Sequence, residues 1–212
     1  AAPTTPATPT PAAPTPSGAS DADTTDLASP THGNQEAWHQ NTSPLLTWQL
    51  PKGATAVQTI ADEDADATPS VEYKPAIVER RIAELDDGVW YFNIRARVGN
   101  AWGPTASYKL QIDSTRPEMT DATFTYDEAR RMLLVSGAEA TDATSGIDRF
   151  EVAIDGEPIT SVTSEAFAGG SYALSYGKAG THTVVVRAYD KAGNYAEASG
   201  SFTVPTSLAD QT

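Results

Sequence analysis

Hydrophobic and polar residues alternate along two stretches of the chain that repeat one another. The stretches begin at Gly88 and Gly180, 92 residues apart, and align without a gap through an Arg-Ala pair at Arg95 and Arg187. Successive side chains of a strand point to opposite faces, so this alternation predicts a half-buried β-strand in each copy. The predicted inward faces carry Trp90, Phe92, Ile94, Ala96 and Val98 in the first copy, and His182, Val184, Val186 and Ala188 in the second.

Each of these strands is followed by a turn and a further strand. The turns contain Gly99-Asn100 and Gly193-Asn194, and Gly and Asn are the residues that most readily adopt the backbone conformations of tight turns. Residues 106–112 and 198–204 then form the second strand of each pair. The pattern therefore predicts two hairpins, each of which closes one domain.

Shorter hydrophobic segments bounded by turn residues precede each hairpin. They are residues 44–51, 57–60 and 77–85 before the first hairpin, and residues 131–135, 150–154 and 172–174 before the second. Short strands separated by turns at this spacing are typical of β-sandwiches. The predicted fold class is all-β, with two tandem β-sandwiches.

The first part of the chain has a different composition. Residues 1–16 contain only Ala, Pro and Thr, so this region buries too little apolar surface to offset its ordering entropy. We predict a disordered Ala/Pro/Thr-rich linker over residues 1–30, either O-glycosylated or an unmodified spacer. The domains that follow are predicted at 31–115 and 116–205, with a polar tail at 206–212 and a hinge from Asp113 to Pro117.

Composition and charge narrow the possible partners. The formal net charge of −14 and the pI of 4.4 disfavour nucleic acid and anionic lipid, because both require a basic face. The chain contains no Cys, so neither disulfides nor thiolate metal sites stabilise it. No apolar run is long enough to span a membrane, and the first 51 residues contain no Lys or Arg, so any signal peptide and anchor are expected outside this segment.

The predicted first domain resembles a fibronectin type III domain. Leu46-Thr-Trp48 with Pro51, and the later segment from Leu85 to Ala96, are similar to the strand B and strand F signatures of that family. The segment from Gln111 to Pro117 is similar to the end of fibronectin-like modules in bacterial surface proteins. The resemblance implies a fibronectin type III-like β-sandwich.

The predicted second domain resembles bacterial Ig-like repeats. The resemblance rests on Asp142-Ala-Thr-Ser-Gly-Ile147 and on the turn segment from Ala188 to Asn194. Together the two resemblances cover about four fifths of the chain, and they imply tandem domains of a bacterial cell-surface or secreted protein. Such sandwiches host many unrelated activities, so the fold is specified better than the function.

Catalytic residues are not expected. The chain has no Gly-x-Ser-x-Gly elbow, no Cys and no His-Glu-x-x-His pair, and only three histidines. His32 and His39 lie in the segment that enters the first domain, and His182 lies on an inward strand face, where a packed structural role is expected. We therefore predict that the protein is not an enzyme.

An EF-hand is excluded by its spacing. Asp62, Asp64 and Asp66 begin like an EF-hand loop, but Ala67 stands where the loop needs Gly and Tyr73 where it needs a bidentate Glu.

A calcium site between the domains is the metal hypothesis that remains. In an Ig-like sandwich the B–C and F–G loops lie at the end where the chain enters, so the oxygen ligands of these loops should converge on the hinge. The candidate ligands are Asp113, Asp142, Asp148, Asp190 and Asn194, with Ser145 in the same loop as Asp142. The alternative is that these residues only close turns through their side chains, with no cofactor bound.

Exposed aromatic residues are candidates for glycan binding. Trp48 and Trp90 are expected in the core, whereas Trp38, Tyr91 and Trp102 lie where they can face solvent. Aromatic rings in loops also pack locally, so the two interpretations stay open.

Two functional hypotheses follow. The first is a non-catalytic structural or interaction module, such as a spacer, stalk or adhesion region of a larger bacterial surface or secreted protein. Its expected partners are other domains of the same polypeptide and a cell-surface protein or glycan, and the chain is expected to be monomeric. The second is a carbohydrate-binding accessory region of a secreted glycoside hydrolase or adhesin.

Overall fold

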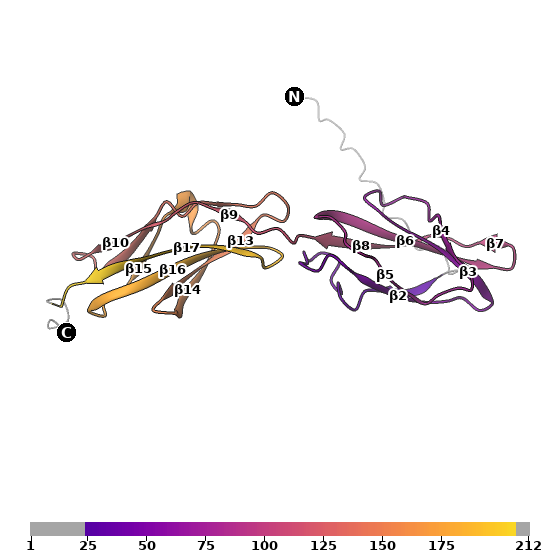
Figure 1. Cartoon of the computed structure of the whole chain (residues 1–212), viewed down its shortest axis with the longest axis horizontal. Coiled ribbons are helices and arrows are strands. Elements are labelled where there is room, and N and C mark those ends of the chain that lie inside the picture. The colour runs from indigo at the N-terminus through magenta and orange to yellow at the C-terminus, as the bar shows by residue number, and fades with distance from the viewer. Residues whose placement is uncertain (1–23, 207–212) are drawn as a thin grey trace, which may run out of the picture.

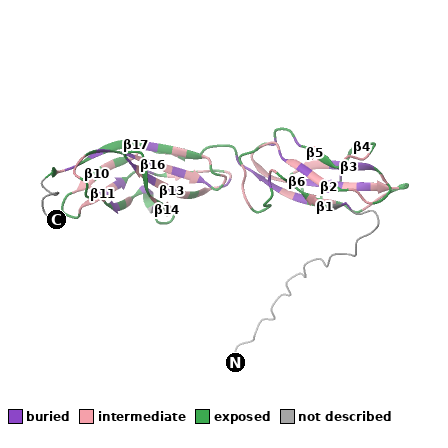
Figure 2. Ribbon diagram, turned by 90° about the horizontal axis from the view of Figure 1, so that it is seen from below, coloured by how far each residue is buried: buried purple, intermediate pink, exposed green. Residues whose placement is uncertain are grey.

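The computed structural model describes residues 24–206 as two β-sandwiches placed end to end (Figure 1). The chain passes once from the first sandwich to the second, through the linker of residues 113–117 that follows β8. Burial alternates along the strands of both sandwiches, with buried residues facing the space between the sheets (Figure 2). Each sandwich therefore has its own hydrophobic core, on either side of a short joint.

The first sandwich consists of a three-stranded and a five-stranded sheet. The smaller sheet has the order β1-β2-β5, formed by Thr25–Ala28, Leu45–Gln49 and Glu79–Arg81. The larger sheet contains β3 (Ala54–Asp62), β4 (Val71–Tyr73), β6 (Gly88–Val98), β7 (Ala101–Trp102) and β8 (Ala106–Ile112). Strand β6 is central, because it pairs antiparallel with β3 on one side and with β7 and β8 on the other.

Aromatic and branched side chains from the two sheets meet in the core of the first sandwich. Trp48 on β2 stacks on Phe92 of β6, with ring centroids 5.7 Å apart, and its indole N–H donates to the carbonyl of Ile77 at 2.9 Å. Phe92, Ile94 and Ala96 are fully buried, as the alternation predicted. Trp90 is only partly buried: it packs against the core, and its indole N–H donates to the carbonyl of Asp86 at 2.9 Å.

The second sandwich repeats this plan with different strand numbers. One sheet has the order β10-β11-β15, formed by Thr123–Asp127, Met132–Ser136 and Tyr172–Ser175. The other has the order β14-β13-β16-β17, formed by Glu157–Thr163, Ile147–Ile154, Gly180–Asp190 and Tyr195–Val204. Two short strands, β9 (Glu118–Met119) and β12 (Ala140–Thr141), pair beside the joint, and a 3-10 turn spans Ala168–Gly170.

The core of the second sandwich also lies between its sheets. Leu133, Val152 and Val186 are fully buried there, and Phe150 stacks on Phe167 with ring centroids 4.3 Å apart. Gly200 on β17 has no side chain, which allows the ring of Phe124 on β10 to lie against it. The two sheets thereby approach each other closely along this side.

The predicted start of the first domain is wrong. Residues 24–30 were predicted to belong to the linker, but Thr25–Ala28 form β1 and pair with β2. Ser29 extends this contact, because its hydroxyl donates to the carbonyl of Leu45 at 2.7 Å. A strand of four residues shows too little alternation to be recognised in the sequence, and this one directly follows a low-complexity region. The rest of the predicted linker, residues 1–23, and residues 207–212 of the predicted tail lie outside the described residues.

The strand predicted over residues 77–85 is much shorter in the structure. Only Glu79–Arg81 form β5, and Ile82 and Leu85 continue as an irregular segment that bonds to the carbonyls of Pro44 and Thr42. Both side chains are nevertheless buried in the core. These side chains are thus buried without the regular hydrogen bonds of a β-sheet. The periodicity of the sequence alone does not distinguish such a segment from a strand.

Within residues 24–206, the structure contains no helix of the length and apolar character needed to cross a bilayer.

Candidate functional site

The linker of residues 113–117 is fixed to the first sandwich by Asp87. One carboxylate oxygen of Asp87 accepts the backbone N–H of Ser114 at 2.7 Å and its hydroxyl at 2.8 Å, and the other accepts the hydroxyl of Thr115. Burial alone would raise the pKa of Asp87, but these donors outweigh burial and lower the pKa. The Asp87 carboxylate therefore holds the first two linker residues after Asp113 against the first sandwich.

The entry segment of the first sandwich fixes the backbone of Asp113. The carbonyl of His39 accepts the N–H of Asp113 at 2.9 Å, and the N–H of His39 donates to Gln111 at 3.0 Å. This parallel bridge beside Ile112 carries the order of β8 one residue beyond the end of the strand.

The second sandwich holds the same linker from the other side. The Asn194 side-chain amide donates to the carbonyl of Asp113 at 2.9 Å, and the N–H of Ser145 donates to the Asp113 carboxylate at 3.1 Å. The guanidinium of Arg116 lies 5.9 Å from the ring centroid of Tyr195, a cation–π distance. The linker is thus bonded to both sandwiches.

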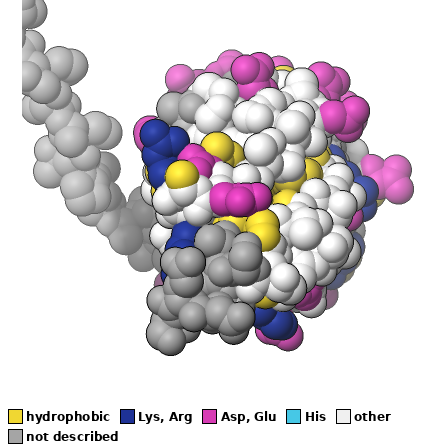
Figure 3. Space-filling view, turned by 90° about the vertical axis from the view of Figure 1, so that its left-hand side faces the viewer, with side chains coloured by type: hydrophobic (Ala, Val, Ile, Leu, Met, Phe, Trp, Pro, Cys, Tyr) yellow, Lys and Arg dark blue, Asp and Glu magenta, His cyan; other side chains and the backbone are white. Residues whose placement is uncertain are grey.

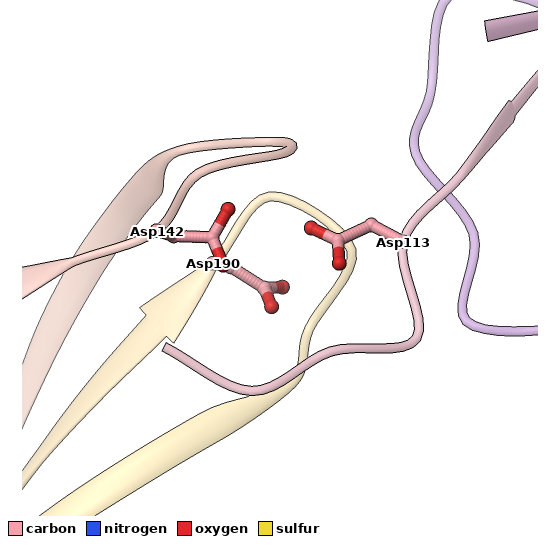
Figure 4. A group of neighbouring side chains, drawn as sticks. All are labelled: Asp113, Asp142 and Asp190. Carbon is pink, nitrogen blue, oxygen red and sulfur yellow. The ribbon is translucent and has the colours of Figure 1, made fainter. Parts of the chain in front are cut away.

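Three carboxylates meet at this joint (Figure 4). Asp113 directly follows β8, Asp142 directly follows β12, and Asp190 is the last residue of β16. One oxygen from each lies within 4.8 Å of the others. Asp113 and Asp190 are almost completely buried, with exposed fractions of 0% and 1%, and Asp142 is partly exposed.

Local turn chemistry positions Asp142 and Asp190. One oxygen of Asp142 accepts the backbone N–H groups of Thr144, Ser145 and Gly146 at 2.8 to 3.1 Å. Asp side chains commonly close turns by bonding to the backbone a few residues further on.

Asp190 closes the β16–β17 turn in the same way, because its two oxygens accept the backbone and side-chain N–H groups of Asn194. The turn-forming alternative considered from the sequence is therefore present, but it uses only part of each carboxylate's capacity for hydrogen bonds.

The electrostatics of this cluster are unfavourable for the residues alone. Two unit charges about 5 Å apart repel each other by about 3 kcal/mol at an effective dielectric constant of about 20, and by less where water reaches Asp142. Burial raises the pKa of Asp113; Ser145 opposes that rise, and the charges of Asp142 and Asp190 add to it. No ion pair within residues 24–206 joins a cation to any of the three.

Many other acidic residues of the described part of the chain lie on the surface. Asp and Glu side chains are spread around the end of the second sandwich that lies away from the joint (Figure 3). Charges there are solvated, so their desolvation free energy is much smaller than that of the buried carboxylates at the joint.

Two of the predicted metal ligands are placed differently from the expectation. Asp148 is exposed and pairs with Arg149 at 3.1 Å, so it lies outside the carboxylate cluster. Asn194 lies at the joint, but its amide nitrogen faces Asp190 and the Asp113 carbonyl, so it donates hydrogen bonds there. Of the five predicted residues, the structure brings together Asp113, Asp142 and Asp190 as a carboxylate cluster, with Asn194 beside them.

The predicted glycan residues are not brought together. Trp102 pairs with Arg97 at the end of the first sandwich away from the joint, and the guanidiniums of Arg95 and Arg97 lie 5.3 and 5.8 Å from its ring centroid. Tyr91 is six residues from Arg97 along β6, roughly 20 Å at the usual strand rise. Trp38 adjoins His39 near the joint. All three are half-buried, and they do not form one flat aromatic face.

His182 is held by two acceptors in the second sandwich. Its Nδ1 lies 2.7 Å from a carboxylate oxygen of Asp155, and its Nε2 lies 2.9 Å from the carbonyl of Lys178. Both ring nitrogens are therefore engaged with neighbouring loops.

Asp87 and Arg116 are joint residues that sequence reasoning missed. Asp86-Asp87-Gly88 has the composition of an ordinary turn, so its spatial neighbours are not evident from the sequence. The Asp113 to Pro117 hinge was recognised, but its cation–π contact requires the position of β17 in the folded domain.

His32 leads to a pH prediction for the first sandwich. The ring is buried; its Nε2 donates to the carbonyl of Asn41 at 2.8 Å, and His39 lies 4.5 Å away between ring centroids. Burial lowers the pKa of His32; the Asn41 bond opposes this, and His39 lowers the pKa further. Since the folded pKa is below the unfolded value of about 6.5, stability is present above that pH and is lost as the pH falls through the lowered pKa.

We expect the melting temperature of the first sandwich to fall between pH 7.5 and pH 5.5, and the fall to be smaller in His32→Gln. Calorimetric melts of both proteins at the two pH values test this. An equal fall in the variant would show that other groups cause the pH dependence.

Comparison with known proteins supports the fold. No protein-family model matches the chain, and no curated protein matches it. Among solved structures, the chain is similar to the fibronectin(III)-like modules of Clostridium thermocellum CbhA, with a TM-score of 0.50 and 17% sequence identity. The match covers 84% of this chain and 93% of that chain, so it extends over both sandwiches. At this identity the likeness concerns the fold alone.

The chain therefore has the all-β fold of two tandem sandwiches that was predicted, and this fold is similar to that of fibronectin(III)-like modules.

Proposed function

We propose that the chain is a non-catalytic spacer and interaction module that holds other parts of a larger polypeptide at a set distance. The observation that supports this most directly is the linker, which is bonded to Asp87 on one side and to Ser145 and Asn194 on the other. A linker without such bonds would leave the sandwiches free to reorient, because small interfaces within a chain generally permit domain motion.

The path of the chain also supports a spacer. The chain enters the first sandwich at the end away from the joint and leaves the second sandwich at its opposite end (Figure 1). The longest strand of each sandwich, β6 or β16, has 11 residues and runs along this axis, which corresponds to roughly 35 Å per module. Partners attached at the two ends would be separated by the whole length of the pair.

The proposed setting is extracellular or at a cell surface, with other domains of the same polypeptide as the main partners and a surface protein or glycan as a further one. The net charge of −14 disfavours nucleic acid as a partner. The Ala/Pro/Thr-rich composition of the first 16 residues is that of a spacer between domains.

The proposal is tested by measuring the distance between the sandwiches in solution. The chain has no Cys, so Ser107→Cys and Ser201→Cys place one spin label on an exposed site of each sandwich. We expect a monomer with a narrow distance distribution by pulsed electron resonance. We also expect a broader distribution in the same labelled chain carrying Asp87→Ala, because the linker then loses its bonds to the first sandwich.

Asp86→Ala is the matched control, since Asp86 is exposed and its side chain makes no hydrogen bond to the linker. This control should keep the narrow distribution. A broad distribution in the chain with Asp86 and Asp87 intact would contradict the rigid spacer.

A further inference from the structure

We propose that Asp113, Asp142 and Asp190 bind one calcium ion across the joint between the sandwiches. Asp113 belongs to the linker, and the other two belong to loops of the second sandwich. The three carboxylates converge on one small volume, with their oxygens facing one another (Figure 4). An ion at this place would connect three segments that are distant in the sequence.

The charge of the cluster is the first argument. All the hydrogen bonds that the three carboxylates accept come from neutral backbone or amide N–H groups, and no ion pair in residues 24–206 involves them. Buried charges in proteins are normally paired or coordinate a metal. A divalent cation would remove the mutual repulsion that the protein's own residues leave uncompensated.

Ser145 provides the second, independent argument. Its side chain is 95% buried, and its hydroxyl has no hydrogen-bond partner within the described residues. The Ser145 side chain lies next to the Asp113 carboxylate. The backbone N–H of Ser145, and not its hydroxyl, donates to both Asp113 and Asp142. A buried hydroxyl without a regular partner is uncommon, and here its oxygen is available to a cation.

The hydrogen bonds leave oxygen atoms free for coordination. The three backbone donors of the loop all bind one oxygen of Asp142, and no hydrogen bond within the described residues occupies the other. Asp142 also lines an open cavity of about 210 Å³ together with Thr115 and Thr144. The cavity reaches the Asp142 side of the cluster, where water can complete the coordination of an ion, and Arg116 also lines it.

The ligand types and spacing favour calcium. The cluster contains carboxylates and a hydroxyl, and no Cys or His, so it suits a hard cation. Calcium binds oxygens at about 2.3 to 2.6 Å in irregular geometries, so ligands up to about 5 Å apart fit around it. Magnesium binds at about 2.0 to 2.1 Å in a strict octahedron, which needs ligands no more than about 4.2 Å apart.

The test is to titrate the full chain, freed of metal by chelation, with calcium chloride and to melt it in calcium and in EDTA. We expect calorimetry to show one bound ion, and the melting temperature to rise by roughly several degrees at a hundredfold excess over the dissociation constant. Magnesium should bind at least about tenfold more weakly.

Asp142→Asn is the most informative variant. Its side-chain oxygen can keep the three backbone hydrogen bonds of the loop, while an NH₂ group replaces the free oxygen. We expect it to lose the calcium-dependent rise, and to melt no lower than the wild type in EDTA because one repelling charge is gone. A variant that only misfolds would melt at a lower temperature in both calcium and EDTA. A variant that only loses the ion would melt lower than the wild type in calcium alone.

Asp148→Asn is the matched control. This substitution removes the same charge at the start of β13, six residues after Asp142, but Asp148 lies outside the cluster. It should bind calcium as the wild type does. The proposal would be overturned by the absence of binding heat at millimolar calcium, by equal effects of the two variants, or by an equal response to magnesium.

Discussion

Replacing Phe92 with alanine is expected to destabilise the first sandwich by about 3–5 kcal/mol and to leave the second unchanged. Phe92 is fully buried at the centre of β6 and stacks on Trp48 from the opposite sheet. The truncation leaves a cavity between two sheets that are tied by many other contacts, so the site cannot collapse to fill it. In scanning calorimetry the melting transition of the first sandwich should fall by more than about 10 °C.

The control for this substitution is Ser107→Ala, because Ser107 is exposed on the neighbouring strand β8. It should shift the same transition very little. A common shift of both transitions in Phe92→Ala would contradict the prediction, and would show that the joint couples the two sandwiches into one cooperative unit.

Gly200→Ala is expected to destabilise the second sandwich by about 1–3 kcal/mol. A Cβ atom at this position would lie 2.6 Å from Cδ2 and 2.9 Å from Cε2 of Phe124, closer than atoms of a packed core approach. At a strand position with free space, the same substitution commonly stabilises a protein, because alanine reduces the entropy of the unfolded chain. At Gly200 the contact with the Phe124 ring should make the substitution destabilising instead. Chemical denaturation measures this change in the free energy of unfolding.

Gly177→Ala is the matched control, since Gly177 has no heavy atom within 4 Å of the added Cβ. Adding Phe124→Leu to Gly200→Ala should recover part of the loss, because the smaller side chain can move away from the new methyl group. Strictly additive effects of the two substitutions would contradict the proposed clash.

The alternation of hydrophobic residues predicted the two long strands well, because burial between two sheets requires period two. Phe92 and Val186 lie in the cores as that pattern required. It failed for residues 77–85, where Ile82 and Leu85 are buried from an irregular segment. It also missed β1, which is four residues long and follows a low-complexity region.

Part of the site could likewise be anticipated. Domain topology places the loops that carry Asp142 and Asp190 at the end where Asp113 enters, so the sequence and a general sandwich plan were enough to group these three residues. Asp148 was included because it is near Asp142 in sequence. Strand alternation and its pairing with Arg149 direct it to the surface instead.

The sequence by itself determined the β-strand pattern, the two-domain repeat and the position of the hinge, because each depends on local composition and spacing. Only the tertiary structure decided that Asp87 holds the linker, that the Ser145 hydroxyl is buried without a regular partner, and that the Asn194 amide donates to the carbonyl of Asp113. These features depend on distances between segments of 27 to 81 residues' separation, which arise only when both sandwiches have packed around the joint.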